Sequence, residues 1–310
     1  MSDNKLNSNS TILVDNTSNI ENFNLQKQGN NIFTSEITGS LTLVDKTKEP
    51  KLNIPISRQS ANALFTFMDK FSYLKDILET KLIFPRYCRE NIEYLGLNKL
   101  PEIAFPMKCF CDIFINKLYE HMNLYGKYGI ALSKEWGLKN QIQPVQYINN
   151  SSFIINSIQD LYNRIQELHI EDDFISDKNK DIKYMENILY DRLRFIKPIY
   201  GDMYRKGKLL KNLNFHDEHE WRYILKIDDD NVYPYITEFN ELLSLSNDLS
   251  KNPNYGLKIN SNDIKYIIVK SNTDRKNLIN FIMKKCSYKK MEKYILISKI
   301  IVFNELKVDW

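Results

Sequence analysis

The sequence predicts an α+β protein with a mixed or antiparallel sheet core, not a doubly wound parallel sheet. Short strand-like segments lie on either side of a pair of long amphipathic helices in the middle of the chain. The last sixty residues have the pattern strand, helix, strand. Strands and helices that are segregated in this way, instead of alternating regularly, are typical of α+β folds.

The composition is that of a globular protein. The chain has 310 residues, of which 43% are hydrophobic and 26% charged, enough for one large domain with a sizeable core. Only 9 glycines are present, and neither glycine-rich phosphate-binding motif occurs. The net charge of +4 is compatible with a nucleic-acid partner but does not indicate one.

We expect a cytoplasmic protein that does not enter a membrane. No apolar run reaches the roughly 18 residues that a membrane helix needs, and the polar segment Met1–Ser10 is unlike a signal peptide. The four cysteines have irregular spacing, which is typical of reduced intracellular thiols.

The first part of the chain is expected to be a loosely ordered arm. Residues 1–50 are rich in Asn, Ser and Thr, and a single domain is predicted over residues 51–310. Within that domain an apolar stripe from Ala63 to Leu78 predicts a helix. Strands are then predicted in a segment that prolines punctuate: Leu82–Phe84, Ile103–Asp112, Tyr128–Leu132 and Val145–Ile148.

A helical insertion is predicted over residues 151–200. Its amphipathic helices are Ser151–Ile170 and Asp181–Ile196, and Pro198 stops the second. Beyond the insertion we predict a strand, then the C-terminal strand, helix and strand: Trp221–Ile227, Ile264–Val269, Asp274–Lys285 and Ile295–Phe303. In the first of these, Trp221 and Tyr223 are expected to face the core.

Glu218 and Glu220 are the candidate catalytic residues. A strand that begins near Glu218 places both of them on one face with Arg222. Two carboxylates this close repel each other, so one could stabilise an oxocarbenium-like centre while the other orients a nucleophile. The alternative is a solvated strand edge at which both pair with Arg222 or nearby lysines. His216 shares this face, but further metal ligands are lacking and we expect no metal.

The segment from Tyr125 to Ser133 allows two interpretations. Gly126 and Gly129 allow a tight turn that leads into a strand. Alternatively, the turn brings the backbone close to a ligand, with Tyr125 or Tyr128 stacking on a ring and Ser133 forming a hydrogen bond to it.

Several blocks of the sequence, in order, resemble the AbiGi-type abortive phage-infection family of bacteria. The blocks are PMKCFCDI, His121, YGKYGIALSKEWG, PVQYI, KP-x-x-G, FHDEHEWRYI and ISKIIVFNELKVDW. The resemblance spans about Ser60 to Trp310 and leaves the first 50 residues uncovered. It implies a role in antiphage defence, as an antitoxin whose partner is a separate toxin, but it implies no chemistry.

A second resemblance, to ADP-ribosyltransferases of the Arg-Ser-Glu type, concerns the mechanism. Arg86, Ser133 and the Glu218/Glu220 pair occur in the order of that family's motifs. The resemblance implies NAD as substrate, with Arg86 on its phosphates, Ser133 in the nicotinamide pocket and Glu220 on the nicotinamide ribose. Glu218 would then orient the acceptor. The chain lacks the family's Ser-Thr-Ser strand, because Lys134 and Glu135 follow Ser133.

These observations leave two functional hypotheses within abortive infection. One is an NAD-using effector of the ADP-ribosyltransferase type. The other is a non-catalytic regulator that silences a partner toxin until infection, with a phage-derived protein as a further candidate partner. A deep pocket flanked by Arg86, Tyr128 and Glu220 would favour the enzyme. An exposed apolar patch on the two middle helices would favour the regulator.

Overall fold

The computed structural model describes residues 56–170, 176–205, 207–227 and 232–305. They belong to one compact unit, which runs from Ile54 to Trp310. The arm predicted at residues 1–50 lies outside the described residues. No helix within the described part of the chain is both long and apolar enough to cross a lipid bilayer.

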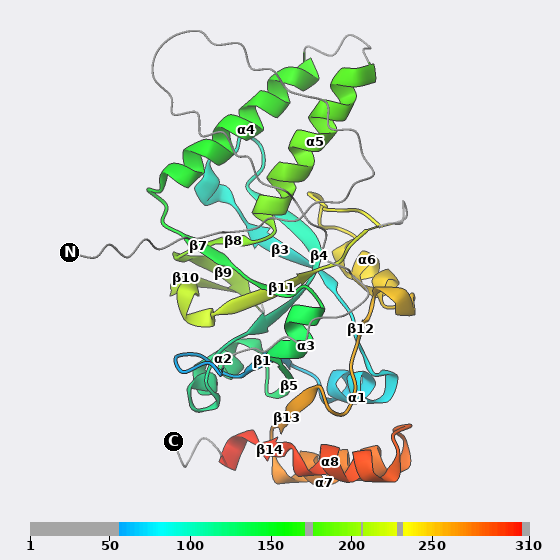
Figure 1. Ribbon diagram of the computed structural model, residues 1–310. Coiled ribbons are helices and arrows are strands. Elements are labelled where there is room, and N and C mark those ends of the chain that lie inside the picture. The colour runs from blue at the N-terminus through cyan, green and yellow to red at the C-terminus, as the bar shows by residue number, and fades with distance from the viewer. Residues whose placement is uncertain (1–55, 171–175, 206, 228–231, 306–310) are drawn as a thin grey trace, which may run out of the picture. The chain divides into compact units, whose positions relative to one another are not determined.

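A mixed sheet of eight strands is the largest sheet among the described residues (Figure 1). Its strands follow the order β14-β13-β5-β1-β4-β11-β6, and β3 pairs with β4 off this path. Only β13 and β14 pair in parallel; the other pairings in this sheet are antiparallel. The strands are β1 (Ala63–Met68), β3 (Arg86–Asn91), β4 (Glu102–Cys111), β5 (Tyr128–Ser133), β6 (Gln143–Pro144), β11 (Glu220–Ile224), β13 (Ile264–Val269) and β14 (Ile300–Val302).

Shorter ladders and the helices surround this sheet. The ladders pair β2 (Leu82–Ile83) with β12 (Leu257–Lys258), β7 (Gln146–Ile148) with β8 (Ile196–Pro198), and β9 (Tyr200–Arg205) with β10 (Lys208–Asn214). The α-helices are α1 (Phe71–Thr80), α2 (Leu118–Tyr125), α3 (Lys134–Lys139), α4 (Phe153–Ile170), α5 (Ser176–Leu193), α6 (Leu242–Leu249), α7 (Asn272–Lys284) and α8 (Lys290–Ser298). The predicted α+β class is confirmed.

The predicted middle pair of amphipathic helices is also confirmed. Helices α4 and α5 pack on each other, and Figure 1 shows them leading away from the sheet. Their apolar stripes share a core with β4 that includes Ile158, Ile165 and Leu189. Of their large apolar side chains that the structure describes, only Phe153 and Tyr184 are exposed.

Two predicted elements are wrong at their boundaries. The stripe from Ala63 to Leu78 is not one helix: its first part is β1, and α1 begins at Phe71. Strand β1 is buried almost throughout, so it lacks the polar alternation that distinguishes a half-exposed strand from a helix. Likewise the predicted strand Ile295–Phe303 is shorter: its first part is the end of α8, and only Ile300–Val302 forms strand β14. The start of α8 is capped by Glu292, which accepts from the Lys289 N–H.

Strand β4 is the branch point of the sheet. On one edge it pairs with β11 from Met107 to Cys111. On its other edge it pairs with β3 up to Met107, and with β1 only at Cys111. The edge is therefore unpaired at residues 108–110, and the sheet forks there between β1 and β3.

Candidate functional site

Glu218 and Glu220 both reach the same buried lysine. Strand β11 begins at Glu220, and Glu218 ends the short 3₁₀ helix η3 (Phe215–Glu218). His219 joins them with φ 41°, in the left-handed region. Lys197 Nζ, from β8, lies 2.6 Å from Glu218 Oε2 and 2.9 Å from Glu220 Oε2. The predicted proximity of the two carboxylates therefore holds, although the strand begins two residues later than expected.

Arg222 is the second cation of the cluster, and its side chain is fully buried. Its Nε lies 2.7 Å from Glu220 Oε1, and its Nη2 lies 3.2 Å from Glu220 Oε2. The same Nη2 lies 3.0 Å from Glu90 Oε2 on β3, and Nη1 donates to the Arg194 carbonyl at 2.9 Å. The guanidinium thus joins β11 to β3 and to the residue that follows α5.

Burial and pairing act on the cluster in opposite directions. Burial alone would raise the pKa of Glu220, but Arg222 and Lys197 outweigh it and hold that pKa well below its usual range. Burial would lower the pKa of Lys197, but Glu220 and Glu218 raise it well above its ordinary value. At Glu90 burial prevails and raises the pKa in spite of Arg222. Glu220 is therefore a firmly ionised carboxylate.

Tyr125 and His121 extend the cluster from α2. The Tyr125 hydroxyl donates to Glu218 Oε1, and burial strongly raises its pKa. The His121 ring stacks on Tyr125 with 4.4 Å between centroids, while the Arg205 guanidinium lies 4.3 Å from the Tyr125 ring centroid. These contacts hold Tyr125 in place against the carboxylate.

A cavity of about 240 Å³ occupies the fork between β1 and β3. Four of the residues that the sequence suggested line it: Arg86, Tyr125, Glu218 and Glu220. Arg86 is exposed at the end of β3, whereas the two glutamates are buried. The fold therefore brings together candidates from three separate segments of the chain.

Tyr128 and Ser133 do not line this cavity. Ser133 Oγ accepts from the Trp136 N–H at 3.1 Å and caps the start of α3, so strand β5 ends at Ser133. The Tyr128 ring stacks on Phe71 at 5.2 Å. Gly126 has φ +136°, and a Cβ there would lie 2.2 Å from the Met68 carbonyl oxygen. The glycine is thus required by a close approach of the chain to itself.

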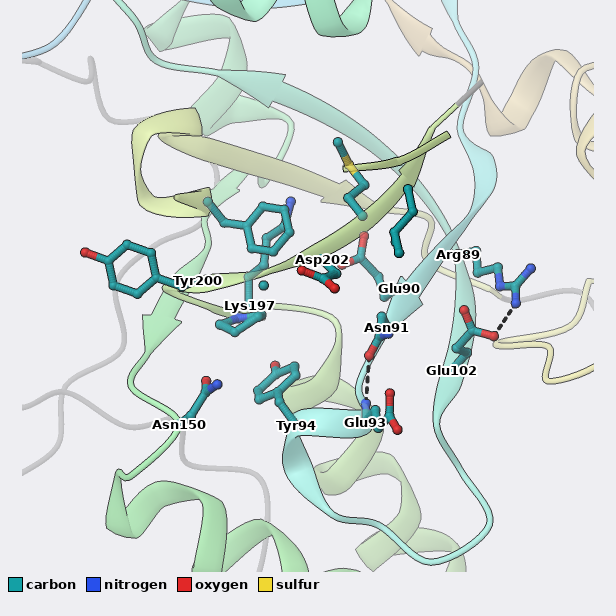
Figure 2. A pocket seen from close by; sticks show the side chains of 15 residues that line it. Arg89, Glu90, Asn91, Glu93, Tyr94, Glu102, Asn150, Lys197, Tyr200 and Asp202 are labelled. Atoms are coloured by element: carbon teal, nitrogen blue, oxygen red, sulfur yellow. Dashed lines mark hydrogen bonds and ion pairs between the residues drawn. The ribbon is translucent and has the colours of Figure 1, made fainter. Parts of the chain in front are cut away.

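A larger cavity of about 760 Å³ shares Glu90 and Lys197 with the fork cavity. Figure 2 shows residues that line it, with the Arg89–Glu102 ion pair at one side and Tyr94, Tyr200 and Asn150 at the other. The Tyr94 hydroxyl is buried and has no hydrogen-bond partner among the described residues. Glu90 and Lys197 therefore lie between the two cavities and line both of them.

The sequence predicted, as an alternative, that the two glutamates pair with Arg222 or nearby lysines, and the structure shows this pairing with Arg222 and Lys197. Glu90 was not predicted, because it lies in a segment noted for other residues. The face with Glu220 and Arg222 is the more buried one, at 6% and 0% exposure, whereas Trp221 and Tyr223 are half-buried. Trp221 and Tyr223 pack against hydrophobic cores, as expected. The solvated edge on the other face was wrong, because Lys197 of β8 and the Arg194 carbonyl after α5 contact that face.

Each carboxylate oxygen of Glu218 and Glu220 already accepts a hydrogen bond or ion pair from the protein. Glu218 is held by Tyr125 and Lys197, and Glu220 by Lys197 and Arg222. In the part of the chain that the structure describes, Glu220 Oε2 has two such partners, whereas the other three oxygens have one each and can accept a further hydrogen bond. Chemically, the cluster is a buried ion-pair network that joins β3, β8 and β11.

Comparisons with known proteins agree on one family. The family model described as "Putative abortive phage resistance protein AbiGi, antitoxin" matches residues 81–270. A protein of Lactococcus lactis subsp. cremoris named "Abortive phage resistance protein AbiGi" is 37% identical over 253 residues, which cover 73% of this chain and 98% of that protein. No solved structure matches the chain.

Proposed function

Because the chain belongs to the AbiGi family of abortive phage resistance proteins, we propose that it defends bacteria against phage by abortive infection, as the antitoxin that silences a partner toxin. The family description supports the antitoxin role. A phage-derived protein is the proposed trigger that releases the toxin.

The buried ion-pair network is the observation that carries the non-catalytic role. The carboxylate oxygens of Glu218 and Glu220 are already engaged by Tyr125, Lys197 and Arg222, so a substrate would have to share them. Breaking a buried pair on one side costs about 3–5 kcal/mol, so these pairs stabilise the arrangement of the segments that they join. The network is suited to holding β3, β8 and β11 in one arrangement.

An NAD-using enzyme of the ADP-ribosyltransferase type is the second candidate. It is favoured by the convergence of Arg86, Tyr125, Glu218 and Glu220 on one cavity. Arg86 would bind the phosphates of the NAD substrate and Glu220 the nicotinamide ribose. The fit is poor as the cavity stands, because about 240 Å³ is below the roughly 300–1,000 Å³ of typical ligand sites.

Deleting the gene for this protein from its complete defence locus distinguishes the two proposed functions. If the protein is the antitoxin, the remaining toxin stops the growth of uninfected cells, and expressing the protein from a plasmid restores growth. If it is the effector, the deleted strain grows normally and loses only its protection against phage. Normal growth of the deleted strain would contradict the antitoxin role.

The variant Arg86→Ala tests the NAD-using alternative at the fork cavity. Because Arg86 is exposed and outside the ion-pair network, we expect this variant to fold normally and to neutralise the toxin as well as the wild type does. Purified wild-type protein with cell extract should leave NAD unconsumed. Arg192→Ala, an exposed arginine on α5, is the control. NAD consumption that Arg86→Ala abolishes and Arg192→Ala retains would establish the enzyme instead.

A further inference from the structure

The C-terminal part of the fold is far more basic than the rest of the chain. Residues 256–305 contain eleven lysines and arginines but only four carboxylates, a net charge of +7. The remainder then holds 32 of the chain's 43 basic side chains and 35 of its 39 acidic ones, a net charge of −3. The mild overall charge of +4 therefore conceals a strongly basic region.

The basic side chains of this region are on the surface. Its exposed lysines are Lys258, Lys265, Lys270, Lys276, Lys284, Lys285, Lys289 and Lys290. Four of them, Lys284, Lys285, Lys289 and Lys290, lie where α7 ends and α8 begins, and we call these four the basic turn. Figure 1 shows α7 and α8 side by side at the end of the sheet away from α4 and α5.

One carboxylate lies close to the basic turn. The Lys289 N–H and Ser261 Oγ donate to Glu292 and lower its pKa, and the Lys289 charge lowers it further. The other three carboxylates have partners elsewhere: Asp263 accepts from the Asn260 N–H, Asp274 accepts from Ser271 Oγ, and Glu305 pairs with Arg275. Among the described residues no acidic side chain forms an ion pair with the basic turn. Four like charges within seven residues repel one another, which favours a polyanionic partner.

We propose that the basic turn binds the phosphate backbone of duplex nucleic acid, independently of toxin silencing. A duplex presents closely spaced phosphates to a lysine cluster and binds it by counterion release. Proteins that prefer single strands add several aromatic side chains on which bases stack. In the described residues from 256 on, only Tyr266 and Tyr294 are exposed aromatics, and Tyr266 already stacks on Phe65.

The salt dependence of binding tests this proposal on the full-length protein. A fluorescently labelled duplex of arbitrary sequence is titrated, and anisotropy gives its affinity. Each phosphate contact adds about −0.9 to the slope of log affinity against log salt, so replacing all four lysines by Gln should reduce the slope by about 3.6. Between about 50 and about 200 mM salt, the wild type should therefore lose about a hundredfold more affinity than this variant.

Two further variants serve as controls. Replacing the exposed Lys99, Lys183, Lys208 and Lys211 by Gln removes the same charge elsewhere and should leave binding nearly unchanged. Replacing the basic turn by four arginines keeps the charge and should keep the slope. The proposal is overturned by absence of duplex binding at about 50 mM salt or by equal losses in both Gln variants. Tighter binding to single strands or to phosphatidylglycerol vesicles would overturn it as well.

Discussion

We expect Arg222→Met to lower the free energy of unfolding by about 3–5 kcal/mol, because it leaves buried carboxylates without their cation. Arg222 is fully buried and pairs with both Glu220 and Glu90. Methionine fills similar space but supplies no charge, so Lys197 alone would face three carboxylates. Urea denaturation at neutral pH, monitored by tryptophan fluorescence, measures the loss.

The control for this prediction is Arg86→Met, which removes an exposed arginine from the same cavity. Surface substitutions usually change stability by less than about 0.5 kcal/mol, so this variant should unfold with the wild type. The double variant Arg222→Met/Glu220→Gln should lose less unfolding free energy than its two single variants lose together. In the double variant the Glu220 charge is removed together with the Arg222 cation that compensates it. Strict additivity would show that Arg222 acts by packing and not by charge.

The second expected result is a loss of stability as pH falls from about 7 to about 5, caused by His121. Burial, then Lys197 and Arg205, lowers the pKa of His121 to about 4, while Glu220 opposes them. Between pH 4 and the ordinary pKa near 6.5, the unfolded chain binds the proton and the folded chain does not. Acidification therefore favours unfolding in that window, by about 2 kcal/mol at pH 5.

His121→Phe isolates this contribution. Phenylalanine can keep the ring contacts with Tyr125 and Phe67 but cannot take up a proton. The difference in unfolding free energy between pH 7 and pH 5 should therefore shrink by about 2 kcal/mol in the variant. Carboxylate titrations are common to both proteins and cancel in this comparison. An identical pH dependence in the two proteins would assign the acid sensitivity to other groups.

The sequence by itself determined the fold class, the two middle helices and the residues that share a face in β11. These features follow from local periodicity: side chains recur every 3.6 residues on a helix and alternate on a strand. It also identified Arg86, Tyr125, Glu218 and Glu220, which line one cavity. The signals were residue types that suit charge and hydrogen bonding, the alternation around Glu220, and the order of Arg86 and the glutamates along the chain.

The tertiary structure alone decided which face of β11 is buried and what holds its charges. Alternation shows that Glu220 and Arg222 share a face, but burial depends on segments that pack on it from elsewhere in the chain. Lys197 comes from β8 and Glu90 from β3, whose pairing with β4 opens the fork. Such contacts form between distant segments only when the whole core assembles, so no local pattern encodes them.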